Sequence, residues 1–348
     1  MKRIAFLAAG AATLCTVACN KNMDVPATAG NETSSVQESV PCTVTLGVKG
    51  AAFTKSTSNS GTYLQLNSLQ ALVFHDGFLE GYAKTEVDIF NDINSIDSEI
   101  SVNCSSGERQ VYLAVNCPDL SAVTTEAGLL AFTVNLSQDN NDNGRMMIGS
   151  DTVTLPAAET VSIEVHRLIS RVVIKKITRA FTVSSAAAKQ LKVTGIYLTN
   201  VAGITNLGSS MAPTTWYNKQ AYNSELSDFT HDSLNQLLAN NASYSTTHYF
   251  LPYPNPTVDD TSAAEWSPRH TRLVVEVQFD NSDTYYYPIT LPVLEANKSY
   301  EIEELILTRL GSENPDTPIT IQDCAFEFTV KDWSTVVVSD EGEDDITI

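Results

Sequence analysis

The sequence is short of basic residues. Its 348 positions hold 21 Lys and Arg against 41 Asp and Glu, which gives a formal net charge of −20. A protein that binds nucleic acid needs a basic face to neutralise the phosphates. The charge balance therefore argues against nucleic acid as a partner and favours a solvated, repulsive surface.

Chemical motifs are also missing. The five histidines are scattered, without HExxH or any other metal spacing, and no GxSxG elbow, P-loop or GxGxxG occurs. The run from Asp139 to Gly144 matches half of an EF-hand loop, but Ser150 stands where the loop needs a bidentate Glu, so turn chemistry explains it better. We expect no enzyme, no metal and no cofactor.

Long apolar runs are absent after residue 19, because none approaches the ~20 residues of a membrane-spanning helix. The one apolar run, Ile4 to Val17, follows two basic residues and has the layout of a secretory signal. Cys19 after a small residue resembles a bacterial lipobox, in which that cysteine is lipidated. We expect a lipoprotein signal peptide over 1–18 and a polar linker over 19–40, with an ordinary signal peptide or a membrane anchor as the alternatives.

Cysteines are few, and no CxxC pair occurs among them, so a zinc site is not expected. Cys42, Cys104, Cys117 and Cys324 follow the signal segment. A turn and one extended strand separate Cys104 from Cys117, which places them ~40 Å apart at ~3.3 Å per residue. We expect separate, mostly buried thiols, and a bridge between these two stays open.

What the sequence has in abundance is short strands. "CTVTLGV" alternates apolar and polar residues, and Asp76-Gly77 between apolar runs predicts a hairpin. The best helix candidates are "AVTTEAGLLAF" and "SELSDFTHDSLNQLLANN". The strand Arg167–Lys176 ends a first set, so we expect an all-β fold of two β-sandwich domains, 41–180 and 181–348.

The last residues form two further strands. Phe326, Phe328 and Val330 alternate with polar residues, and Thr335–Val338 follows after Trp333. Chain ends usually fray unless something ties them down. Two well-patterned strands at this position therefore need a partner.

Several segments, taken in order, resemble the fimbrillins, the pilus subunits of Bacteroidales. They are the lipobox at Cys19, "CTVTLGVKGAAFTK", "ALVFHDGFLEGYAK", "CSSGERQVYLAVNC", "HRLISRVVIKKI", "YPNPT", "NKSYEIEELILTRLGSENPDTPI" and "CAFEFTVKDW". Each piece alone is weak. Their order and spacing over most of the chain make the resemblance specific.

The resemblance implies two tandem transthyretin-like β-sandwich domains. It also implies an outer-membrane lipoprotein precursor, with a lipid such as palmitate on Cys19, that reaches the cell surface. There a trypsin-like protease removes the first strand of the N-terminal domain. A C-terminal strand from another copy, or from a related pilin, then fills the groove, and subunits join head to tail into fimbriae that support adhesion.

Carried onto this sequence, the removable first strand is 42–48, with Val44, Leu46 and Val48 as its inward face. The cleavage position is Lys55, with Lys49 as the competing site. The major fimbrillin of the oral species of Bacteroidales has Arg at the position of Lys55, so a protease that tolerates Lys is required. The donor strands lie within about 325–338. Their candidate groove fillers are Phe326, Phe328, Val330, Val336 and Val338.

Two alternatives stay open. One is a tip or anchor pilin of the same pilus. The other is a surface glycan-binding lipoprotein that uses the aromatic clusters Trp216-Tyr217 and Tyr285–Tyr287, although such clusters in β-proteins are more often core or cross-strand pairs.

Overall fold

The computed structural model describes residues 39–49, 66–86, 99–140, 144–219, 226–258, 266–317 and 324–333. All of them belong to one unit, Ser39–Ile348. The expected division of the chain at residue 180 stays a prediction.

The part of the chain before residue 168 forms two sheets. The first has the strand order β4-β1-β8, and the second has the order β3-β2-β5-β7-β9. The strands of the first are β1 (Pro41–Val48), β4 (Glu99–Ser105) and β8 (Val161–Ile163). Those of the second are β2 (Ser68–His75), β3 (Phe78–Glu86), β5 (Gly107–Val115), β7 (Met147–Leu155) and β9 (His166–Arg167).

The predicted hairpin at Asp76-Gly77 is confirmed. Strands β2 and β3 pair antiparallel around it. Both turn residues have positive φ, 50° at Asp76 and 80° at Gly77. This is the conformation of a type I′ turn, whose twist matches the twist of the flanking strands.

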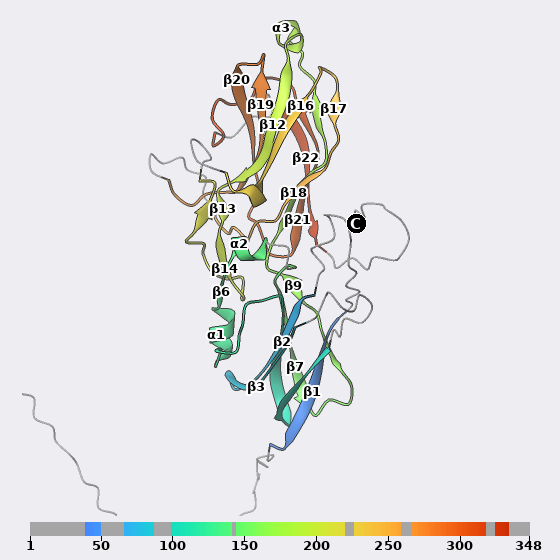
Figure 1. The fold of residues 1–348 in the computed structure, drawn as a ribbon, viewed down its shortest axis with the longest axis vertical. Coiled ribbons are helices and arrows are strands. Elements are labelled where there is room, and N and C mark those ends of the chain that lie inside the picture. Colours follow the sequence, from blue (N-terminus) through green and yellow to red (C-terminus); the bar gives the residue numbers. More distant parts are fainter. Residues whose placement is uncertain are drawn as a thin grey trace, which may run out of the picture. The chain divides into compact units, whose positions relative to one another are not determined.

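The later part of the chain forms two further sheets (Figure 1). One has the order β17-β11-β21-β10-β18, with β22 paired to β21 outside this path, and the other has the order β16-β12-β19-β20. The strands of the first are β10 (Arg171–Ile174), β11 (Ile177–Arg179), β17 (Ser243–Tyr244), β18 (His248–Phe250), β21 (Lys298–Leu307) and β22 (Cys324–Asp332). Those of the second are β12 (Leu191–Thr199), β16 (His231–Leu237), β19 (Arg272–Phe279) and β20 (Asp283–Thr290).

Small elements complete the described fold. Strand β13 (Val201–Ala202) pairs with β15 (Trp216–Tyr217), and β14 (Ile204–Asn206) pairs with β6 (Thr133–Asn135). The short helices are α1 (Glu126–Leu130), α2 (Leu136–Asp139), α3 (Ser184–Ala187) and the 3₁₀ turn η2 (Asp228–Thr230). The first predicted helix is confirmed as α1, where the Thr125 side chain caps the helix by accepting from the Gly128 amide. The expected all-β class with few short helices is confirmed.

Two sequence expectations differ from the structure. The second predicted helix is instead η2 followed by strand β16, which pairs with β12. Neighbouring strands decide the conformation there, because local helical preference is weak against tertiary pairing. The expected strand Arg167–Lys176 is divided into β9 and β10, and β10 pairs with β18 and β21 of the later part.

Buried side chains gather in two clusters. The smaller one joins the β4-β1-β8 sheet to the β2-β5-β7 strands. The larger one joins the two later sheets and also contains residues of β2, β5 and the α1 region. The first strand of the chain therefore belongs to the smaller core, and β22 borders the larger one.

Candidate functional site

Strand β1 is the central strand of its sheet. It pairs antiparallel with β4 along seven residues of each strand, from Pro41↔Ser105 to Gly47↔Glu99. Its other edge pairs parallel with β8, from Leu46↔Val161 to Val48↔Ile163. Both edges of β1 are therefore used, and β4 and β8 are held together through it.

The inward face of β1 fills the smaller core. Val44, Leu46 and Val48 are 1%, 0% and 8% exposed. They belong to the cluster that includes Leu69, Val73 and other residues of the facing sheet. Burying a side chain of this size contributes about 1.5–3 kcal/mol, so the three together contribute about 5–9 kcal/mol as an upper estimate. A whole domain has only about 5–15 kcal/mol of net stability.

The end of β1 is tied into the sheet at Lys49. The Lys49 backbone amide donates to the carbonyl of Ile163 at 2.8 Å. Its side chain is 62% exposed and pairs with Glu164 at 3.6 Å. Lys55 lies further along, in the connection between β1 and β2, outside the described residues.

Strand β22 has the opposite setting. Among the described residues it pairs with one strand only, β21, from Lys298↔Asp332 to Leu307↔Cys324. Phe326 and Val330 are 41% and 49% exposed. Phe328 is half-buried and lies against Tyr300, with 6.1 Å between the ring centroids. The apolar row of β22 is thus largely uncovered on an edge strand.

The two ends of β22 are anchored. Cys324 at its start is 1% exposed, and Trp333 just after its end is 8% exposed. The Trp333 amide donates to the Asn297 carbonyl at 3.0 Å. The guanidinium carbon of Arg167 lies 4.4 Å from the centroid of the Trp333 ring, a cation–π contact, and burial lowers the pKa of Arg167 to about 10.

A buried carboxylate also holds β22 close to its C-terminal end. Glu301 of β21 is 1% exposed. Its carboxylate lies 3.0 Å from the Lys331 ammonium of β22 and 3.1 Å from that of Lys175. Burial alone raises the pKa of Glu301, but hydrogen bonds from Lys331, Lys175 and Ser299 outweigh burial and hold the pKa below its usual range.

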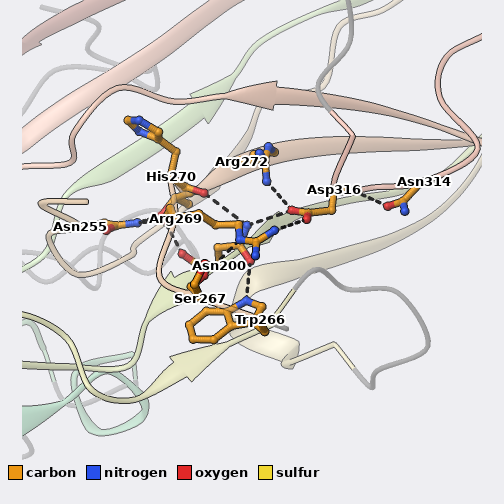
Figure 2. Close-up of polar contacts among 10 residues, drawn as sticks. Asn200, Asn255, Trp266, Ser267, Arg269, His270, Arg272, Asn314 and Asp316 are labelled. Carbon is orange, nitrogen blue, oxygen red and sulfur yellow. Dashed lines mark hydrogen bonds and ion pairs between the residues drawn. The ribbon is translucent and has the colours of Figure 1, made fainter. Parts of the chain in front are cut away.

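The connection from β21 to β22 is fixed by a buried charge cluster (Figure 2). Asp316 accepts from the Arg269 guanidinium at 2.6 Å and from the Arg272 guanidinium. Arg269 and Arg272 are 0% and 1% exposed, and Asp316 is 9% exposed. The Asp316 amide donates to the Asn314 side chain at 2.8 Å. The segment that leads to β22 is therefore anchored at Asp316 to the start of β19 (Figure 2).

The sequence did not reveal these polar anchors. Arg269 and Arg272 lie in "SPRHTR", which has no motif character, and Asp316 is 44 residues away from the nearer arginine. Only the three-dimensional pairing brings them together. The sequence hints at such a pairing only through Arg272, which directly precedes an apolar run. An arginine at the start of a buried strand needs a carboxylate partner.

Some of the remaining candidate residues lie within the described part of the chain and others lie outside it. Cys19, Lys55, Val336 and Val338 lie outside the described residues. Of the aromatic clusters, Trp216 is 8% exposed with its ring centroid 5.4 Å from that of Trp266, and Tyr287 is 0% exposed. These two rings serve the core.

Within the described residues, no group of His, Cys, Asp or Glu is arranged to hold a metal ion. No helix in that part of the chain is long and apolar enough to cross a membrane. Asp139, which opens the EF-hand-like run, is 0% exposed and accepts from the Met146 amide at 2.8 Å.

The comparisons with known proteins agree with this architecture. The family model described as major fimbrial subunit protein (FimA) matches residues 41–166. No curated protein matches the sequence. Among solved structures, a putative cell adhesion protein from Bacteroides eggerthii is 15% identical with a TM-score of 0.61, covering 85% of this chain and 96% of that one.

Two fimbrial structures from Porphyromonas gingivalis are also similar. The fimbrilin FimA is 14% identical with a TM-score of 0.59, covering 84% of this chain and 98% of that one. The tip fimbrial protein Mfa3, with a C-terminal truncation, is 13% identical with a TM-score of 0.51, covering 85% and 100%. At these identities the matches show the fold.

The β-fold of this chain is the fold of the cell adhesion and fimbrial structures named above. The resemblance found in the sequence is confirmed. Residues 41–166 of this chain match the major fimbrial subunit family model.

Proposed function

We propose that this protein is a shaft subunit of a pilus that polymerises by strand exchange. Strand β1 is removed by proteolysis, and a C-terminal strand of a neighbouring copy takes its place. The observation that carries the proposal is the central position of β1 between β4 and β8. A central strand that leaves exposes two strand edges and an apolar groove at the same time.

The energetics favour refilling of that groove. Loss of β1 removes about 5–9 kcal/mol of apolar burial by the estimate above. It also leaves unpaired backbone groups along β4 and β8, which form a template for another strand. A strand added from a second molecule restores both the hydrogen bonds and the core. Such a contact is heterologous and does not close, so it produces a filament.

Lys55 is the proposed cleavage position, and the setting of Lys49 supports this choice. The Lys49 amide is hydrogen-bonded to Ile163 within the sheet, so a protease cannot take up the backbone there without first opening it. Susceptibility to proteolysis follows from exposed, unpaired backbone. A cut after Lys55 also leaves the whole of β1 on the released fragment.

The donor lies within about 325–338, and the contacts of β22 favour its later part. Cys324, Trp333 and the Glu301–Lys331 pair hold β22 on β21. Phe326 and Phe328 are also larger than the Val44 and Leu46 that they would replace, and overpacking a core costs about 1–3 kcal/mol. Val336 and Val338 have the right spacing and size. We therefore propose that β22 stays paired with β21 and that the residues after Trp333 are donated to the neighbouring copy.

The resemblance to fimbrillins supports a proposal for export and location. We propose that Cys19 is lipidated, that the lipid holds the precursor at the outer membrane, and that the processed subunits form fimbriae on the cell surface. The partners are other copies of this chain or related pilins, together with a trypsin-like protease that tolerates Lys. A tip or anchor pilin is the second candidate, since the tip protein Mfa3 shares the fold.

Limited trypsin digestion followed by electron microscopy tests the proposal. Wild-type chain should be cut after Lys55, as shown by N-terminal sequencing, and should then form filaments. Lys55→Ala should resist this cut and stay monomeric, whereas Lys49→Ala, the matched control, should behave as wild type. Filaments from uncut Lys55→Ala, or cut protein that stays monomeric, would overturn the proposal for a shaft subunit.

Two charge substitutions then locate the donor. Val338→Asp should abolish filaments if the residues after Trp333 are donated, while Phe328→Asp should leave assembly largely intact. The reverse result would assign β22 itself as the donor strand.

A further inference from the structure

Two cysteines face each other across the first strand and its neighbour. Cys42, the second residue of β1, is the register partner of Cys104 in β4. Their sulfur atoms lie 3.8 Å apart. Both side chains are half-buried, so reagents can reach them.

This placement is compatible with a disulfide. Residues directly opposite in an antiparallel pair have Cα atoms about 4.5–5.5 Å apart. Disulfides span Cα separations of about 4.4–6.8 Å. The backbone is therefore already in range, and the sulfurs need only rotate about 2 Å closer to reach the bond length of about 2.05 Å.

The other two described cysteines have a different setting. Cys117 and Cys324 are 6% and 1% exposed. The Cys117 thiol donates to the carbonyls of Val115 at 3.4 Å and Met147 at 3.6 Å. The expectation of separate, mostly buried thiols holds for these two, while Cys104 has Cys42 as its neighbour. Pairing of Cys104 with Cys42 is therefore the alternative to the Cys104–Cys117 bridge that the sequence left open.

We propose that Cys42 and Cys104 form a cross-strand disulfide that ties β1 to β4. The oxidant is a disulfide, either of a thiol–disulfide oxidoreductase or of a small thiol such as glutathione. One cysteine thiolate attacks it and forms a mixed disulfide, releasing the first thiol. The thiolate of the second cysteine then attacks the protein sulfur of the mixed disulfide and releases the second thiol. The two cysteines lose two electrons and two protons, and the oxidant gains them.

The bridge has a consequence for the proposed strand exchange, on which this step of the inference rests. Cys42 lies on the N-terminal side of Lys55, and Cys104 lies on the other side. A cut after Lys55 therefore leaves β1 covalently attached to β4. The groove stays filled until a reductant opens the bridge, so the disulfide keeps cleaved protein from assembling.

The bridge is tested first by itself. The full chain is oxidised with oxidised glutathione, its free thiols are alkylated, and the chain is digested without reduction. Mass spectrometry should find the peptides of Cys42 and Cys104 joined, 2 hydrogen atoms lighter than their sum. In Cys42→Ser the Cys104 peptide should be alkylated or carry glutathione. Independent alkylation of both cysteines in oxidised wild type, or a Cys104–Cys117 pair, would overturn the proposal.

The effect on assembly is tested second. Oxidised wild type cut by trypsin should keep its N-terminal fragment on a denaturing, non-reducing gel and form no filaments; added reductant should release the fragment and restore filaments. Cut Cys42→Ser should assemble without reductant. Filaments from the bridged, cut protein would contradict the control of assembly. A third outcome separates the two proposals. If oxidised wild type gives the joined peptides, but reduced, cut wild type and cut Cys42→Ser both stay monomeric, the disulfide is supported and the proposal of strand exchange fails.

Discussion

Strands β1 and β22 have the same alternation in sequence and opposite environments in the structure. The inward-facing Val44, Leu46 and Val48 of β1 are at most 8% exposed, while Phe326 and Val330 of β22 are 41% and 49% exposed. Strand β1 has a partner on each edge, and among the described strands β22 has β21 alone. One strand completes a core, and the other lies at the margin of one.

The difference shows what alternation can and cannot tell. A period of two predicts which face of a strand is apolar. It does not predict whether a second layer covers that face, because the covering residues come from distant parts of the chain. An apolar face left uncovered on an edge strand is the place where another strand can add.

The largest effect on the β22 side is expected from Asp316→Asn. This substitution leaves Arg269 and Arg272 buried without their carboxylate, and breaking a buried pair in this way costs about 3–5 kcal/mol. Chemical denaturation of the full chain measures the free energy of unfolding. The matched control is the exposed Glu313→Gln, which should change it by less than about 0.5 kcal/mol.

An Asp316→Asn protein as stable as the control would show that the cluster does not anchor the connection to β22. The structure would then give less reason to regard β22 as a strand that stays on β21.

The next effect compares the two strands directly. Leu46→Ala removes a fully buried side chain and should cost about 2–5 kcal/mol in the uncut protein. Val330→Ala removes a half-exposed side chain and should cost less than about 1 kcal/mol. Equal losses in unfolding experiments would mean that the two apolar rows are equally covered.

The smallest effect concerns the Glu301 carboxylate. Lys331→Met removes one of its two cations, and because Lys175 remains the cost should be about 1 kcal/mol. Hydrogen exchange of the β22 amides should rise in this variant. Lys298→Met, whose exposed partner is Asp332, should leave the exchange unchanged.

The same carboxylate gives a pH dependence. The pKa of Glu301 is lower in the folded protein than in the unfolded chain. Its contribution is therefore complete above the unfolded pKa of about 4.3 and is lost as the pH falls through the lower folded value. Protection of β22 should be constant above that pH and fall below it. Loosening on the alkaline side instead would contradict the assigned role of Glu301.

Local signals predicted much of the fold. Asp76-Gly77 specified its turn, the pattern of "AVTTEAGLLAF" indicated α1, and alternation identified β1 and β22. The failures were non-local. His231–Leu237 is a strand because β12 pairs with it, against its helical pattern.

Parts of the candidate site also needed the structure. The pairing of Asp316 with two arginines depends on how a connection packs against β19, and the register that places Cys42 opposite Cys104 depends on the pairing of two distant strands. Neither arrangement leaves a periodic pattern in the sequence.

We have proposed that β1 is a replaceable strand whose place a neighbouring molecule fills. Hydrogen exchange of the β4 and β8 amides tests it most directly, under reducing conditions. Three states are compared: the uncut chain, cut Phe328→Asp/Val338→Asp protein that cannot donate, and wild-type filaments. Protection should be high in the uncut chain, lost in the cut variant and regained in filaments. Protection that survives in the cut variant, or stays lost in filaments, would contradict the account.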